Sequence, residues 1–132
     1  MVLELCERAS ASESAAKEAA RALRREFKYA DPSAQLSAAR LWAIMLRNCS
    51  EVFTEQTASR KNLDAVEDVI SSNKTTPVVR ERLLEVLGTA AYNCTGNDKK
   101  HPFAVLWRRV KPHSAPEQVR CLLFLSMNYV YL

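Results

Sequence analysis

The sequence predicts an all-α protein, and three observations lead to this conclusion. The 132 residues include only two glycines, Gly88 and Gly96, which leaves few positions for tight β-hairpin turns. No segment alternates apolar and polar residues for long enough to indicate a strand. Apolar residues instead recur at spacings of three and four. Proline also follows a capping residue at Asp31-Pro32 and at Thr76-Pro77, as it does at the start of a helix.

Length and composition fit one globular domain. A chain of 132 residues buries roughly two-thirds of the surface that its unfolded form exposes. Hydrophobic residues make up 48% and charged residues 26%, which is not the composition of a disordered chain. The four cysteines are scattered and form no Cys-x-x-Cys pair, at positions Cys6, Cys49, Cys94 and Cys121. We therefore predict no metal site and no cofactor, and expect free thiols in a reducing cytosol.

Four segments are expected to form amphipathic helices, each with one apolar stripe. They span residues 14–29, 60–71, 78–93 and 102–110. The first three stripes consist of Ala16, Ala19, Ala20, Leu23 and Phe27, of Leu63, Val66 and Ile70, and of Val79, Leu83, Val86, Leu87 and Ala90. Charged residues such as Glu67 and Arg80 fall off these stripes and are expected to face solvent.

The segment 32–48 differs because apolar residues surround it on nearly every side. Its polar stripe is narrow and consists of Ser33, Ser37, Arg40 and Arg47. A helix that is apolar all round must be covered by other helices, so we expect this one in an inner layer, with Trp42 in the core. It ends at Asn48-Cys49-Ser50.

A faint internal repeat supports stacked helices. The helix over 78–93 ends at Asn93-Cys94-Thr95, and Asn93 lies 45 residues after Asn48. Helical-repeat proteins have periods of about 40–47 residues. The sequence therefore predicts a right-handed superhelix of about six to seven antiparallel helices, with armadillo-like stacking.

The positive charge is concentrated in one segment. The net charge is +4, and residues 99–111 contain no acid and five cations, which are Lys99, Lys100, Arg108, Arg109 and Lys111. Each cation near an anionic leaflet contributes about 1 kcal/mol of attraction. We interpret the segment as a binding site for anionic lipid or acidic peptide, and a solvated helix end is the alternative interpretation. Nucleic acid is not expected, because Trp107 is the only aromatic residue that the pattern places beside these charges.

Catalysis is not predicted. No serine or cysteine stands in a nucleophile motif, and the two histidines, His101 and His113, do not form an acid–base pair by their positions. Paired carboxylates such as Asp64 and Asp68 are four residues apart, as on any solvated helix face. The sequence indicates a protein that is not an enzyme.

Four stretches resemble the VHS domain, an α-superhelical module of vesicle-trafficking proteins. They are "VLELCERAS", "AAKEAARALRREFKYADPSAQLSAARLWAIMLRNC", "NCSEVFTEQTASRKNLDAV" and "VVRERLLEVLGTAAYN". The resemblance covers residues 1–112 and implies that these lack the first helix of the family. It is strongest to fungal VHS proteins of the Las-seventeen-binding type. Residues 113–132 form an atypical tail. Its end, "CLLFLSMNYVYL", is too short to span a bilayer, which takes about 20 residues.

The resemblance implies a cytosolic adaptor module in endocytic or endosomal protein sorting, peripheral to the endosomal or plasma membrane. In related domains ubiquitin docks on the early helix through apolar side chains. Leu3 occupies one of these positions, with Val2 and Glu7 as neighbours. The implied partners are ubiquitin or ubiquitylated cargo, a phosphoinositide membrane surface, and endocytic or actin-regulatory proteins.

The sequence is also compatible with other ligands. One branch of the family binds acidic sorting signals in a groove that corresponds here to 61–71 and 103–110, flanked by Lys61, Arg108 and Arg109. Asp64 falls in this groove, where a carboxylate repels an acidic ligand. The related CTD-interacting domains bind phosphopeptides on the same superhelix. A different class of function is the alternative: a structural scaffold that binds another protein and has no ubiquitin or membrane ligand.

Overall fold

A computed structural model describes residues 2–96 and 98–115 of the chain, and these residues form seven α-helices and no strand. The helices are α1 (Val2–Ser10), α2 (Glu13–Tyr29), α3 (Pro32–Asn48), α4 (Glu51–Thr57), α5 (Arg60–Ser71), α6 (Pro77–Asn93) and α7 (Pro102–Val110). The all-α class predicted from the sequence is confirmed. What was expected of the tail beyond residue 115 lies outside the described residues.

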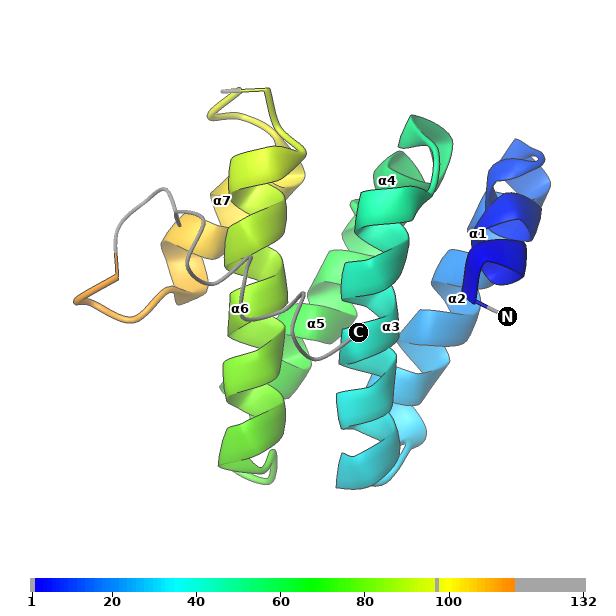
Figure 1. Cartoon of the computed structure of the whole chain (residues 1–132). Coiled ribbons are helices and arrows are strands. Elements are labelled where there is room, and N and C mark those ends of the chain that lie inside the picture. Colours follow the sequence, from blue (N-terminus) through cyan, green and yellow to red (C-terminus); the bar gives the residue numbers. More distant parts are fainter. Residues whose placement is uncertain (1, 97, 116–132) are drawn as a thin grey trace.

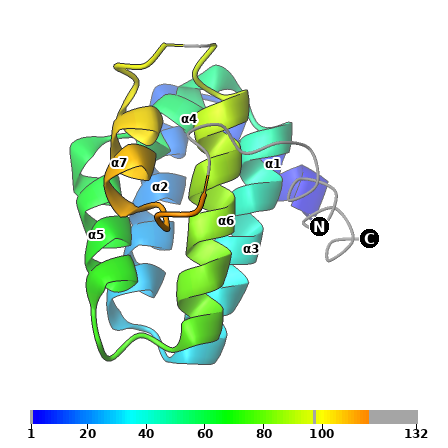
Figure 2. The same ribbon diagram turned by 90° about the vertical axis from the view of Figure 1, so that its left-hand side faces the viewer.

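The helices stack in two layers, as the predicted superhelix requires. In one layer α1, α3 and α6 lie side by side, and in the other α2, α5 and α7 do so (Figures 1 and 2). The short helix α4 packs mainly against α2. Helices α3 and α6, which end on the two matching Asn-Cys pairs, are neighbours and end on the same side of the molecule (Figure 1).

Local sequence signals begin the helices. The side chain of Asp31 accepts a hydrogen bond from the amide of Ala34 at 2.8 Å, and Pro32 takes the first position of α3. Ser12 caps α2 in the same way, through the amide of Ala15 at 3.0 Å. Proline also opens α6 and α7. These caps satisfy amide groups that a helix leaves without partners at its first turn.

The core is centred on Trp42, whose side chain is 1% exposed. Its ring lies 5.8 Å from that of Phe27 and 6.1 Å from that of Phe103, measured between ring centroids. Trp42 therefore joins α2, α3 and α7 in one cluster. Trp107 is also buried. The predicted apolar stripes of α2, α5 and α6 are buried as expected, except for Ala19, which is half-buried.

Helix α3 lies in an inner layer, but it is not covered on every side. Ala38, Ala39, Ala43 and Met45 are buried with Trp42. Four larger apolar side chains of this helix are only half-buried, namely Leu36, Leu41, Ile44 and Leu46. The expectation of a fully surrounded helix is therefore wrong for one flank, because among the described helices α1, α2 and α6 pack against α3 and leave part of its surface uncovered.

Two polar joints, each at least partly buried, hold neighbouring helices in register. The amide of Asn62 in α5 donates to the carbonyl of Ala20 at 3.0 Å and accepts from the guanidinium of Arg24 at 2.8 Å. Arg80 in α6 donates to three backbone carbonyls, those of Ile70, Ser72 and Thr75. The first joint ties α5 to α2, and the second closes the turn between α5 and α6.

Candidate functional site

Helix α1 presents an apolar side chain to solvent. Leu3 is 71% exposed, and Glu7, four residues later, lies on the same face. Val2 instead shares the stripe of Cys6 and Ala9, which are buried, and is 39% exposed at the end of the helix. The three residues predicted to contact ubiquitin are thus close together, but Leu3 and Glu7 form the open face and Val2 lies at its edge.

An apolar groove runs beside this face, between α1, α2 and α3. Its space is about 440 Å³. The lining is mostly apolar and includes Leu5, Leu23, Leu41 and Met45, together with the smaller side chains of Ala19, Ala22, Ala34 and Ala38. Glu26 is its acidic member. This groove explains why Leu41 is only half-buried, and none of its residues was predicted from the sequence to bind a ligand.

The basic segment folds back on itself so that its two ends approach. The guanidinium of Arg108, near the end of α7, donates to the backbone carbonyl of Lys99 at 2.6 Å. This contact brings the loop that carries Lys99 and Lys100 next to the last turn of α7. The Lys111 ammonium donates to the carbonyl of Ala115 at 2.9 Å. The Asp98 carboxylate accepts a hydrogen bond from the amide of Lys100 at 2.9 Å. An acid therefore lies directly before residues 99–111, the segment in which the sequence analysis found five cations and no acid.

Arg109, one of the residues predicted to bind an anion, is paired with an acid of α5. Its guanidinium donates two hydrogen bonds to the Glu67 carboxylate of α5, at 2.7 and 2.9 Å. This carboxylate raises the pKa of Arg109, and Asp64 adds to the effect. In this structure the Arg109 guanidinium is paired with an acid 42 residues away in sequence, and its assignment to an anion site stays a prediction.

The proposed groove for acidic peptides between α5 and α7 contains two acids. These helices pack side by side (Figure 2). The Arg109–Glu67 pair bridges them, and Asp64 is exposed on α5, 3.9 Å from Arg60. Lys61 is exposed in the first turn of α5. The charges between α5 and α7 therefore disfavour an acidic ligand.

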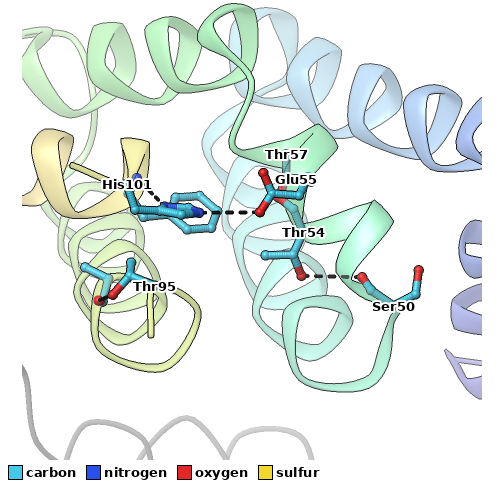
Figure 3. A network of polar contacts seen from close by, with 8 residues as sticks. Ser50, Thr54, Glu55, Thr57, Thr95 and His101 are labelled. Carbon is cyan, nitrogen blue, oxygen red and sulfur yellow. Dashed lines mark hydrogen bonds and ion pairs between the residues drawn. The ribbon is translucent and has the colours of Figure 1, made fainter. Parts of the chain in front are cut away.

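His101 is a structural element that the sequence did not reveal. It precedes α7, and its Nδ1 atom accepts a hydrogen bond from the amide of Phe103 at 3.2 Å. Nε2 faces the carboxylate of Glu55 in α4 at 3.5 Å, as Figure 3 shows. Nδ1 is thus the ring atom that caps the helix, and Nε2 is the ring atom turned towards α4. His101 thus caps α7 and orients the loop of the basic patch.

The described residues hold no cluster of metal ligands, and burial makes one of their thiols a poor nucleophile. No three histidine, cysteine, aspartate or glutamate side chains within 2–96 and 98–115 are arranged to hold a metal ion. Burial, together with the nearby Glu55 carboxylate, raises the pKa of the Cys94 thiol to about 11, which is the opposite of what a nucleophile needs. None of the helices in these ranges has the length and apolar composition needed to cross a lipid bilayer.

Comparison with known proteins places these features in context. A family model, the VHS domain, matches residues 1–102. A curated relative, vacuolar protein sorting-associated protein 27 of Yarrowia lipolytica (strain CLIB 122 / E 150), is 31% identical over 85 residues. That alignment covers 64% of this chain and 15% of the relative's length. Among solved structures, none matches the chain significantly.

Proposed function

The chain belongs to the VHS domain family, and from this membership we propose a non-enzymatic adaptor module in vesicle-mediated protein sorting. It binds ubiquitin or ubiquitylated cargo on α1 and a phosphoinositide membrane through the loop before α7 and the end of that helix. It acts in the cytoplasm, peripheral to the endosomal or plasma membrane. The name of the Yarrowia relative, a vacuolar sorting protein, supports the sorting role.

The observation that carries the ubiquitin proposal is the exposure of Leu3. A leucine that is 71% exposed contributes little to the core, although its neighbours Cys6 and Ala9 are buried. One exposed apolar side chain next to Glu7 offers a small apolar contact with a polar edge, as weak, transient complexes use. Leu5, which is 37% exposed, extends the apolar surface towards the groove.

The membrane proposal rests on four cations that flank or belong to α7. Lys99, Lys100, Arg108 and Lys111 lie in the loop before α7, in its last turn and just after it. Their attraction to an anionic leaflet sums to roughly 4 kcal/mol at low salt and falls as salt screens it. Asp98 and Glu55 reduce this sum because they border the same loop.

An NMR titration of the isotope-labelled chain with unlabelled ubiquitin tests the first ligand. We expect amide shifts confined to residues around Leu3 and Glu7, and their loss in Leu3→Ser. Val78→Ser is the matched control, because Val78 is an exposed apolar residue on α6. A dispersed spectrum that millimolar ubiquitin leaves unchanged would exclude ubiquitin as a ligand of this chain.

Flotation with liposomes tests the second ligand. We expect the chain to float with phosphoinositide vesicles at low salt, and the double variant Lys99→Glu/Lys100→Glu to stay in solution. Arg25→Glu/Lys28→Glu makes the same charge change on exposed residues of α2 and should float like the wild type. Equal loss in both double variants would indicate a general charge effect and no specific patch.

A second function is favoured by the apolar groove between α1, α2 and α3. A groove lined by leucines, alanines and a methionine suits a helix of a protein partner. In that case the chain is a structural scaffold with no ubiquitin or membrane ligand. It would then remain in solution at all salt concentrations in the flotation experiment, and ubiquitin would cause no shifts.

A further inference from the structure

Two cysteines meet where α1 crosses the junction between α3 and α4. The Ser10 hydroxyl at the end of α1 accepts a hydrogen bond from the amide of Ser50 at 2.9 Å. Cys6 lies one helical turn before Ser10 and therefore on the same face of α1, and Cys49 is the neighbour of Ser50. The contact between the serines thus brings the two cysteines to the same point.

The two thiols differ in their exposure to solvent. The Cys6 side chain is 3% exposed and belongs to the core, whereas Cys49 is half-buried at the end of α3. Burial raises the pKa of the Cys49 thiol, the neighbouring Cys6 thiol raises it further and the Ser10 hydroxyl lowers it, so both groups lie beside Cys49. A reagent from solvent therefore reaches Cys49 first, and Cys6 stands behind it as the only neighbouring thiol within the described residues.

We propose that Cys6 and Cys49 are a dithiol modification site, which a small-molecule disulfide such as oxidised glutathione converts to an intramolecular disulfide. The bond would fasten α1 to the end of α3. Helix α1 has only nine residues and is held by few contacts beyond α2, so a covalent link at this position limits its movement. The proposal does not depend on which ligand the α1 face binds.

The reaction proceeds in two balanced steps. The Cys49 thiol loses its proton to solvent, and its thiolate attacks one sulfur of glutathione disulfide, so that a mixed disulfide forms and one glutathione leaves. The Cys6 thiolate then attacks the Cys49 sulfur and displaces the second glutathione. The two protein thiols lose two electrons, and glutathione disulfide gains them as two molecules of glutathione. The first step is slow near neutral pH, because burial and the Cys6 thiol raise the pKa of Cys49 to about 12.

The test treats the full chain, in a Cys121→Ser background, with oxidised glutathione and maps the products by mass spectrometry without reduction. We expect a peptide pair linked through Cys6 and Cys49, with the loss of two hydrogen atoms. The initial rate should rise about tenfold per pH unit between pH 7 and pH 10, as the thiolate fraction does. Cys94 is the internal control: it is half-buried, and no other thiol among residues 2–96 and 98–115 is found in contact with it.

The two sites should give different end products. Cys94 should stop at the glutathione adduct, whereas at Cys49 the adduct should be transient. In the Cys6→Ser variant, Cys49 should keep the glutathione adduct. If that variant loses its helical circular dichroism, Cys6→Ala replaces it, with the same expected result. A persistent adduct on Cys49 with Cys6 intact, or a link from either residue to Cys94, would overturn the proposal.

Discussion

Arg109 of α7 and Glu67 of α5 form a two-point ion pair, with nitrogen–oxygen distances of 2.7 and 2.9 Å. The pair holds two helices of the same layer together and removes one charge from the basic patch. Its side chains are 56% and 28% exposed, so the pair stabilises the fold only modestly. Its larger effect is on the electrostatics of the surface that we propose to meet a membrane.

Glu67→Gln should release the Arg109 charge to the patch. We expect binding to anionic vesicles to strengthen by about 1 kcal/mol, or roughly fivefold, and the free energy of unfolding to fall by at most about 1 kcal/mol. Vesicle sedimentation at low salt and urea unfolding measure the two effects. Glu81→Gln removes an equal charge from an exposed position on α6 and serves as the control. Equal strengthening in both variants would show that Arg109 was not held back by Glu67.

Trp42→Ala should lower the free energy of unfolding by about 3–5 kcal/mol, because it leaves a cavity between three helices. The ring contacts Phe27 of α2 and Phe103 of α7, so its removal affects both layers. Urea denaturation followed by circular dichroism gives the value. Tyr29→Ala should change it by less than about 0.5 kcal/mol, since Tyr29 is 80% exposed. A similar small loss at Trp42 would contradict a central role for this ring.

Asn62→Ala should cost about 1–3 kcal/mol, because it leaves the half-buried guanidinium of Arg24 without this acceptor. The side chain of Asn62 is buried although it is polar, and both of its bonds go to α2. Urea unfolding is again the measurement, and Asn73→Ala, at an exposed position, is the control. If the two variants were equally stable, the joint between α5 and α2 would contribute nothing.

Cys94 should make stability fall at alkaline pH. Its pKa is raised from 9.0 to about 11 in the folded chain, so the folded state holds this proton more tightly than the unfolded state. The resulting stability is fully present below pH 9 and is lost as the pH rises through 11. We expect the stability difference between the wild type and Cys94→Ala to shrink with a slope of up to about 1.4 kcal/mol per pH unit in this window. Urea unfolding with a reducing agent at pH 8, 9 and 10 measures it, and a constant difference would refute the assignment.

Most of the fold was predictable because its signals are local. The caps at Asp31 and Ser12 use side chains within three residues of the amides that they serve. The apolar stripes of α2, α5 and α6 follow from a spacing that any helix imposes. The bounds expected for the helices over 60–71 and 102–110 agree with α5 and α7.

The candidate site was harder to predict, since charge in a sequence does not show which partner a side chain will meet. Residues 99–111 contain five cations, but Asp98 lies one position earlier and was not included. Glu67 is 42 residues from Arg109, so the sequence did not indicate that the two would pair. The leucines of α3 that are half-buried were likewise predicted to be covered by other helices on every side. Whether a neighbouring helix covers such a residue depends on how α1 and α2 pack, and not on α3 itself.

The sequence by itself determined the helices and their apolar faces, and its motifs indicated the VHS family, because capping, helical spacing and motif order are properties of nearby residues. The tertiary structure decided which charges stay free, which apolar faces stay open and which thiols meet. These depend on contacts such as Arg109 with Glu67 and Ser10 with Ser50, which join residues about 40 positions apart. Only the packing of whole helices brings such residues within hydrogen-bonding distance.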